Sequence, residues 1–94
     1  MLKRSTTRRV MVIHPGGIHA RPSLAIVKTV RQFESQVQIR RGDQVADAGN
    51  ILDLMALGAP HGSELLLSAE GLDAGEALEA LEKLFADDFG MSEE

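Results

Sequence analysis

The spacing of hydrophobic and polar positions changes along the chain, and each change marks the boundary of a predicted element. Residues 8–13 form a short run rich in β-branched residues, which ends at His14-Pro15-Gly16-Gly17 and predicts a first strand. From Ala20 onward the apolar positions take helical spacing, which predicts a helix ending near residues 32–33. The apolar stripe of this helix, expected in the core, consists of Leu24, Ile26, Val27, Val30 and Phe33.

Strand-like patterns return after this helix. Val37 and Ile39 alternate with polar residues, and Gly42-Asp43 supplies turn residues before a short strand that contains Val45, so a hairpin is predicted. The leucine-rich run 64–69 is too short for a typical helix and is bounded by glycines. It predicts a buried strand.

Two further helices follow from capping residues and helical spacing. Asn50 is a suitable N-cap for a short helix to about Leu57, with Asp53 placing negative charge in its first turn and Gly58 able to end it. A longer amphipathic helix, which Gly90 and the acidic end should terminate, has glutamates outside its apolar stripe. That stripe consists of Ala74, Ala77, Leu78, Leu81, Leu84 and Phe85.

These elements predict one small α/β (α+β) domain. Four short strands with interspersed helices favour two layers, an antiparallel sheet covered on one face by helices. A ferredoxin-like module explains much of the same pattern with one helix fewer in its core repeat. The length of 94 residues is that of a single domain.

Composition narrows the classes of function. Aliphatic side chains must fill the core, since there are three Phe and no Trp or Tyr, and a flat base-stacking surface is therefore not expected. The chain has no Cys and hence no disulfide framework. No apolar run approaches the ~18 residues of a membrane span, and the first residues lack the apolar core of a signal peptide. We therefore expect a cytoplasmic protein without membrane insertion.

The net charge of −4 hides an asymmetry. Residues 1–41 carry nine basic groups and one acid, whereas residues 42–94 carry thirteen acids and one base. These charges either balance within the folded domain or form a basic rim around His19 that attracts acidic partner proteins. Nucleic acid is the least favoured partner, because the basic residues are scattered over several predicted elements and the pI is about 5.3.

The segment Gly16-Gly17-Ile18-His19-Ala20-Arg21-Pro22 places an imidazole where a turn becomes a helix. Pro22 suits the first helical turn, in which free backbone N–H groups and the helix dipole favour an anion. His19 supplies a nucleophilic nitrogen, and Arg21 supplies a charged fork for phosphate oxygens. These residues are consistent with a phosphoryl site, and equally with a structural or solvated histidine beside a helix start.

The string Gly-Ile-His-Ala-Arg-Pro resembles the active-site signature of HPr, the histidine phosphocarrier of the bacterial phosphotransferase system. Residues 50–58 and 62–71 resemble the second helix and last strand of that family, and the resemblance covers about residues 7–88. It implies an HPr-like open-faced two-layer sandwich, with a four-stranded antiparallel sheet covered on one face by three helices in the order βαββαβα. Residues 1–94 then form a single domain whose core is about 7–88, with a flexible basic N-terminus and an acidic C-terminus.

The resemblance also implies a mechanism. His19 matches the phosphohistidine, whose Nδ1 (pros nitrogen) accepts a phosphoryl group from enzyme I and passes it to enzyme II A domains for sugar uptake. Arg21 matches the arginine that handles the phosphate charge, while Ala20, Pro22 and Gly17 match positions that shape the phosphate site. The implied protein is a monomeric carrier turned over by partner enzymes, with no cofactor and no metal.

The second helix carries the implied docking surface and one departure from the family. Ile51, Leu52 and Met55 match the apolar patch that docks both partners, although the same side chains could instead face the core. Asn50 stands where the Gram-positive branch has a serine phosphorylated by a kinase. An amide has no hydroxyl to phosphorylate, so this regulatory switch is not expected here.

Two alternatives remain open at this point. A regulatory paralogue of the nitrogen-type phosphotransferase branch would use the same phosphorylation, and a noncatalytic α/β interaction module would use His19 only as a structural residue. His14 and His61 adjoin prolines and are assigned to solvated turns rather than to a metal site. Ser23 has no recognisable His-Asp partners, which disfavours hydrolase chemistry.

Overall fold

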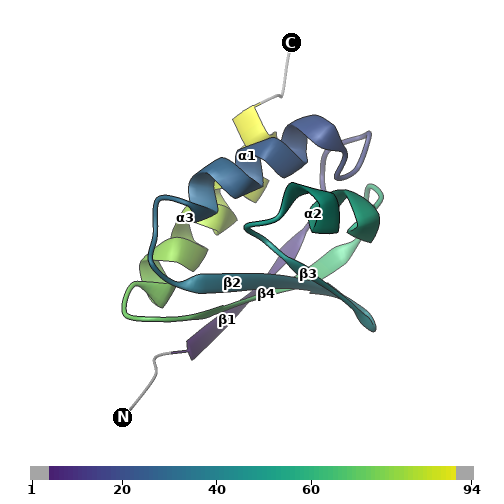
Figure 1. Cartoon of the computed structure of the whole chain (residues 1–94). Coiled ribbons are helices and arrows are strands. Elements are labelled where there is room, and N and C mark those ends of the chain that lie inside the picture. Colours follow the sequence, from purple (N-terminus) through teal and green to yellow (C-terminus); the bar gives the residue numbers. More distant parts are fainter. Residues whose placement is uncertain (1–4, 91–94) are drawn as a thin grey trace.

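A computed structural model describes residues 5–90, and the expected flexible basic N-terminus and acidic C-terminus include residues 1–4 and 91–94, which lie outside the described residues. The order of strands and helices confirms the predicted βαββαβα arrangement (Figure 1). The elements are β1 (Ser5–Met11), α1 (Ala20–Val30), β2 (Gln36–Arg41), β3 (Gln44–Asp47), α2 (Ile51–Leu57), β4 (Glu64–Glu70), α3 (Ala74–Ala86) and a final turn η1 (Asp88–Gly90).

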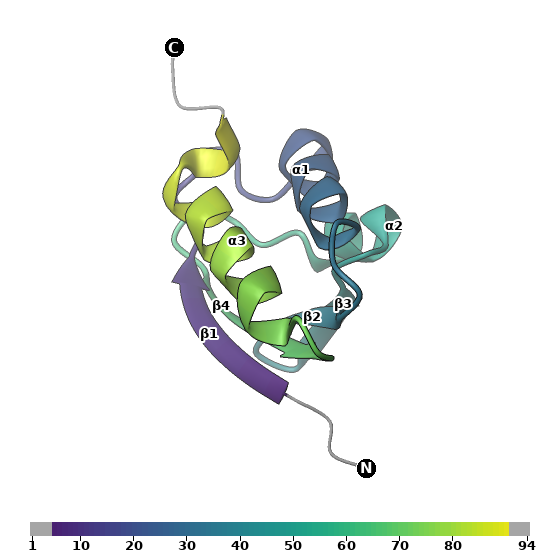
Figure 2. The ribbon, with the colours of Figure 1, turned by 90° about the vertical axis from the view of Figure 1, so that its left-hand side faces the viewer.

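The strands form one sheet in the order β1-β4-β2-β3, and every neighbouring pair is antiparallel. All three α-helices lie on the same side of this sheet, which the view in Figure 2 shows most clearly. The central helix α1 packs against both α2 and α3. The predicted open-faced two-layer sandwich is therefore confirmed.

Strand alternation builds the sheet side of the core. Val37 and Ile39 of β2 lie opposite Ala69 and Leu67 of β4, and all four side chains are buried against the helices. Burying an aliphatic side chain of this size contributes roughly 1.5–3 kcal/mol, so these alternate positions fix which face of the sheet is covered. Leu66, on the other face of β4, is only half-buried. The strand is therefore buried on one face and not on both.

The bounds of β1 differ from those predicted from the run of β-branched residues. All seven residues from Ser5 to Met11 pair with β4, so the strand begins before residue 8. Backbone bonds continue through Val12, whose N–H donates to Ser63 at 2.9 Å, whereas Ile13 lies beyond the strand. The predicted strand 8–13 was therefore displaced toward the C-terminus, because a partner strand decides where pairing stops.

The predicted ends of the long helices were also too late. In α1 the N–H groups of Gln32 and Phe33 bond three residues back rather than four, so the helix passes into a tight turn after Val30. α3 ends at Ala86, ahead of Gly90. Leu24 was placed in the core but is 44% exposed, because the buried side of α1 is formed by residues 22, 23, 26, 27 and 30.

Asp73 binds the turn that follows α1 to the start of α3. Its carboxylate accepts hydrogen bonds from the backbone N–H of Glu34 at 2.8 Å and of Ser35 at 2.9 Å, and from the Ser35 hydroxyl. These bonds favour the ionised form, and the Ser35 hydroxyl makes the largest contribution to lowering the pKa of Asp73 below its usual 3.8. The carboxylate therefore orients α1 relative to α3.

Replacing Asp73 by Asn should lower the melting temperature at neutral pH, because the charged acceptor of three hydrogen bonds is lost. Since the folded pKa is lowered, the stabilisation is present above the unfolded value and disappears as pH falls through the folded one. The difference between wild type and Asp73→Asn, measured by thermal unfolding, should shrink from about pH 5 downward. Asp43→Asn, in the exposed turn between β2 and β3, is the control that should change nothing. A difference that persists in acid would contradict this role.

Candidate functional site

The loop that carries the motif is fixed by a close approach of two backbones. The N–H of Ile18 donates to the carbonyl of Ala59 at 2.8 Å. Gly17 has φ +72°, and a Cβ on it would lie 2.5 Å from the same carbonyl oxygen and 2.9 Å from Cα of Pro60. Only glycine combines this positive φ with this lack of space. The expected role of Gly17 in shaping the loop thus has a steric cause.

His19 is the N-cap of α1. Its backbone is extended, with φ −122° and ψ −157°, and its carbonyl accepts the first helical hydrogen bond from Ser23 N–H at 2.9 Å. The imidazole makes no capping bond and is exposed. Because it caps nothing, the side chain is available to a partner.

The first turn of α1 presents free donors next to this imidazole. The N–H groups of Ala20 and Arg21 have no acceptor within residues 5–90, and Pro22, at the third helical position, has no N–H to offer. Two aligned donors and the positive end of the helix dipole favour an anion at this end of α1. Arg21 is exposed and forms no ion pair in the described part of the chain, so its guanidinium is free to contact an incoming anion.

The orientation of the His19 ring is restricted by Gly16. A Cβ at residue 16 would lie 3.2 Å from both Cδ2 and Nε2 of His19. This edge of the imidazole therefore faces the loop backbone, and the opposite edge, which carries Nδ1, faces away from it. The geometry distinguishes the two ring nitrogens.

His14 does not lie in a solvated turn, contrary to the expectation from sequence. Its side chain is 13% exposed, and its Nδ1 lies 2.9 Å from Oδ1 of Asp88. Its ring lies 5.2 Å from that of His19 and 6.4 Å from that of Phe89, measured between centroids. No local spacing could have revealed this, because the partner carboxylate is 74 residues away along the chain.

The other polar residues near the motif fall outside the site. Ser23 is fully buried one turn into α1, where its hydroxyl cannot reach a substrate. His61 is exposed in the loop before β4, as expected. Within residues 5–90, no three potential ligands lie close enough together to bind a metal ion.

The second helix begins and ends as predicted. The Asn50 side-chain oxygen accepts hydrogen bonds from Leu52 N–H at 3.0 Å and from Asp53 N–H at 3.2 Å, and Gly58 ends α2 in the left-handed conformation. A side-chain hydrogen bond from Arg41 to the carbonyl of Leu57, at 3.1 Å, fixes the C-terminal end of α2 to β2.

The expected docking residues divide by exposure. Leu52 is 73% exposed and Met55 is 45% exposed, so both are available to a partner. Ile51 is half-buried and packs against the core, next to the inward side of α2 that Leu54 and Leu57 form. An apolar pair on this helix therefore faces solvent, with Ile51 at its edge.

Two of the sheet arginines lie on the face of the sheet that the helices leave open. Arg9 and Arg40 flank Leu66 in the strand register, and this row lies on the open face, away from the helices. Arg8 lies 3.4 Å from Glu82 in an exposed ion pair. The arginines of β1 and β2 thus lie on both faces of the sheet, and Arg21 is the basic residue of the motif itself.

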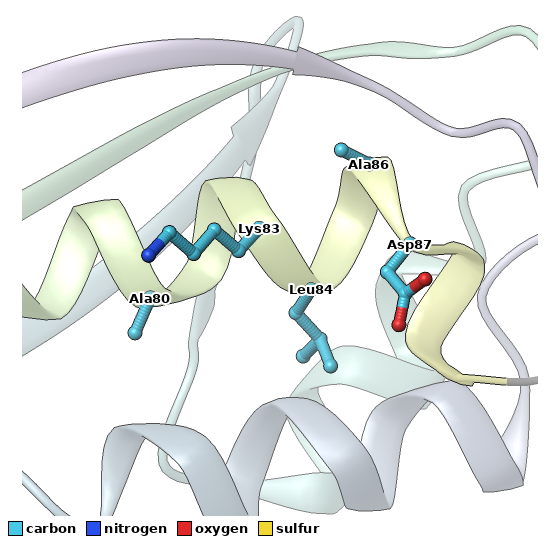
Figure 3. Close-up of a pocket in the computed structure, with 5 residues that line it drawn as sticks. All are labelled: Ala80, Lys83, Leu84, Ala86 and Asp87. Atoms are coloured by element: carbon cyan, nitrogen blue, oxygen red, sulfur yellow. The ribbon is translucent and has the colours of Figure 1, made fainter.

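A shallow hollow of about 590 Å³ lies along the last turns of α3 (Figure 3). Its lining combines three aliphatic side chains with Lys83 and Asp87, and contains none of the histidines. In the described residues, no helix has the length and apolar character needed to cross a bilayer.

Comparison with known proteins agrees with this geometry. Residues 6–87 match a family model described as the PTS HPr component phosphorylation site, PTS being the phosphotransferase system. The chain belongs to the HPr family. It is 39% identical over 93 residues to the phosphocarrier protein HPr of Cupriavidus necator, covering 99% of this chain and 100% of that protein. The crystal structure of an HPr from Thermoanaerobacter tengcongensis matches with a TM-score of 0.88 and 33% identity, covering 94% of this chain and 99% of that one.

A longer relative carries a similar segment. The multiphosphoryl transfer protein of Xanthomonas campestris is 40% identical over 70 residues, which make up 74% of this HPr chain but 8% of the relative. The chain is thus an HPr-type phosphocarrier of the phosphotransferase system, and its family is one of carriers rather than independent catalysts.

Gly17→Ala should destabilise the fold more than Gly42→Ala, although both positions have positive φ. Gly42 has φ +59° and open space around it, so alanine there incurs only the left-handed backbone cost of roughly 1–2 kcal/mol. At Gly17 the methyl group also collides with the backbone of residues 59–60, which should add a further ~1–3 kcal/mol. Denaturant unfolding measures the free energy of unfolding of both variants. Equal losses of stability would refute the steric role of Gly17.

Proposed function

We propose that this HPr-family protein accepts a phosphoryl group on Nδ1 of His19 from phosphorylated enzyme I and passes it to enzyme II A domains during sugar uptake. The observation that carries the proposal is the exposed imidazole at the N-cap of α1, beside the free N–H groups of Ala20 and Arg21. The carrier acts as a cytoplasmic monomer that partner enzymes phosphorylate and dephosphorylate.

The chemistry at His19 needs only a nucleophile and an anion site. The lone pair of neutral Nδ1 attacks the phosphorus of the donor, and the bond between phosphorus and the donor atom breaks, leaving its electron pair on the donor. In the second transfer an acceptor nucleophile displaces Nδ1 in the same way, and the electron pair returns to His19. Phosphoryl transfer depends mainly on positioning and charge stabilisation, which a helix N-terminus supplies.

Four neighbours support these steps. The N–H groups of Ala20 and Arg21 bind the phosphoryl oxygens, and the Arg21 guanidinium neutralises part of their charge. Pro22 fixes the backbone of the first turn, and Gly17 holds the loop against the chain after α2. Because His19 is exposed, the phosphoryl group stays accessible to the acceptor.

The surface that docks the partner proteins is the exposed apolar pair Leu52 and Met55 on α2. Leu52 and Met55 are exposed on a helix that packs against α1, and Ile51 extends the patch at its half-buried edge. The flexible thioether of Met55 suits a surface that must fit two different partners. Regulation by a serine kinase has no substrate at Asn50, which caps the helix with its amide instead.

Incubation with phosphoenolpyruvate and enzyme I should add one acid-labile phosphoryl group per chain, and His19→Ala should abolish it because the nucleophile is gone. Mass spectrometry and radiolabel retention measure this. His61→Ala, which removes an exposed histidine outside the motif, is the matched control and should label normally. Undiminished label in His19→Ala would place the phosphoryl group elsewhere.

Met55→Glu should slow phosphoryl transfer about tenfold or more, because an anion replaces a buried apolar contact of the docked complex. Leu72→Glu is the control, since Leu72 is an 84% exposed apolar residue in the turn before α3. This turn contacts Glu34, just after the C-terminal end of α1, whereas His19 lies at the N-terminal end of that helix. Transfer rates from enzyme I and circular dichroism should show a slow but folded Met55 variant and a Leu72 variant of normal rate. Equal rates in the two variants would remove α2 from the docking surface.

A further inference from the structure

His14 links the C-terminal end of the described chain to the histidine of the motif. Its Nδ1 is hydrogen-bonded to Asp88 at 2.9 Å, and its ring lies 5.2 Å from that of His19, inclined by 50°. His14 and Asp88 are only 13% and 14% exposed. A largely shielded imidazole held by a carboxylate therefore flanks an exposed one, and nothing in the phosphoryl chemistry described above has used it.

The backbone around Asp88 adopts an unfavourable conformation. Asp88 has φ +52° and Phe89 has φ +58°, in the left-handed region that non-glycine residues rarely adopt. Phe89 is 6% exposed and packs edge-on against Phe85, with 4.9 Å between ring centroids. This packing holds the turn η1 in place, and the turn brings the Asp88 carboxylate to His14.

The hydrogen bond to Asp88 also fixes the state of His14. A carboxylate only accepts, so Nδ1 of His14 carries the proton and the ring cannot flip without losing the bond. Gly16 lies close to both imidazoles: a Cβ there would lie 3.5 Å from Cδ2 of His14 and 3.2 Å from Nε2 of His19. His19 is thus bordered by the Gly16 backbone at one edge and by an immobilised ring beside it.

We propose that His14, oriented by Asp88, is a positioning residue for the phosphorylation of His19. It keeps the His19 imidazole in the orientation that turns Nδ1 away from the loop and toward an incoming phosphoryl group, while Nε2 stays against Gly16. This inference rests on the proposed role of His19. Its consequences are the choice of nitrogen and the rate of transfer.

The test uses variants suited to the backbone. Asp88→Gly removes the carboxylate and Asp88→Asn keeps an oxygen that accepts from His14, and glycine and asparagine both tolerate positive φ. Asp87→Asn is the matched control, because Asp87 lines the hollow along α3 (Figure 3) and its side chain makes no hydrogen bond within residues 5–90. His14→Ala removes the flanking ring itself.

Enzyme I kinetics should show kcat reduced about tenfold in His14→Ala and Asp88→Gly with KM unchanged, since the docking residues on α2 are intact. Phosphorus and nitrogen NMR should detect phosphate on Nε2 as well as on Nδ1 in both variants. Asp88→Asn and the control Asp87→Asn should both have the wild-type kcat and carry the phosphoryl group on Nδ1.

A wild-type kcat and phosphate on Nδ1 alone in His14→Ala would overturn the inference, as would identical defects in Asp88→Gly and Asp88→Asn. Ring contacts of His19, measured by nuclear Overhauser effects in the unphosphorylated protein, provide an independent criterion. The inference requires that the ring orientation be lost in His14→Ala. A wild-type protein that takes up no phosphoryl group would refute the proposed function, while these ring contacts would still decide the positioning role.

Discussion

The approach of Gly17 to Ala59 is the contact on which the site depends. An N–H from the loop and a carbonyl from the chain after α2 meet at 2.8 Å, and the missing Cβ of Gly17 makes this approach sterically allowed. The loop before α1 is therefore anchored to the chain that follows α2. α2 is in turn held to the sheet by Arg41 and by Asp53, whose carboxylate accepts from Asp47 N–H at 3.1 Å. These contacts set the position of His19 relative to α2.

Features that depend on a few neighbouring residues could be predicted from the sequence. The Asn50 cap and the ending of α2 at Gly58 depend on a few adjacent residues, and the structure confirms both. Periodicity predicted that α1 is amphipathic, but not where its buried side is centred, which is why Leu24 was misplaced. Partner strands set the true length of β1. The sequence of β1 alone does not show which residues of β4 it will pair with.

The surroundings of His19 also combine features set by adjacent residues with features set by distant ones. Its position at the start of a helix follows from Gly17, Pro22 and the residues between them, whereas its neighbour His14 is fixed by Asp88 from the other end of the chain. The left-handed turn that carries Asp88 costs of order 1–3 kcal/mol per strained residue, a conformation that propensity alone argues against. Burial of Phe89 offsets this cost. Sequence reasoning fails here because long-range packing overrides a local preference.

The order β1-β4-β2-β3 has a consequence for how the chain acquires its structure. The central strand β4 is the last strand along the sequence, so β1 has no hydrogen-bonded neighbour until residues 64–70 have been synthesised. Closing the loop between β1 and β4 costs entropy before any ladder forms, which makes folding late and cooperative. A nascent chain that ends before residue 64 has only the β2–β3 hairpin of the sheet. The last strand to emerge therefore joins β1 to the β2–β3 hairpin, and the fold is complete only when α3, which follows it, has packed on β1 and β4.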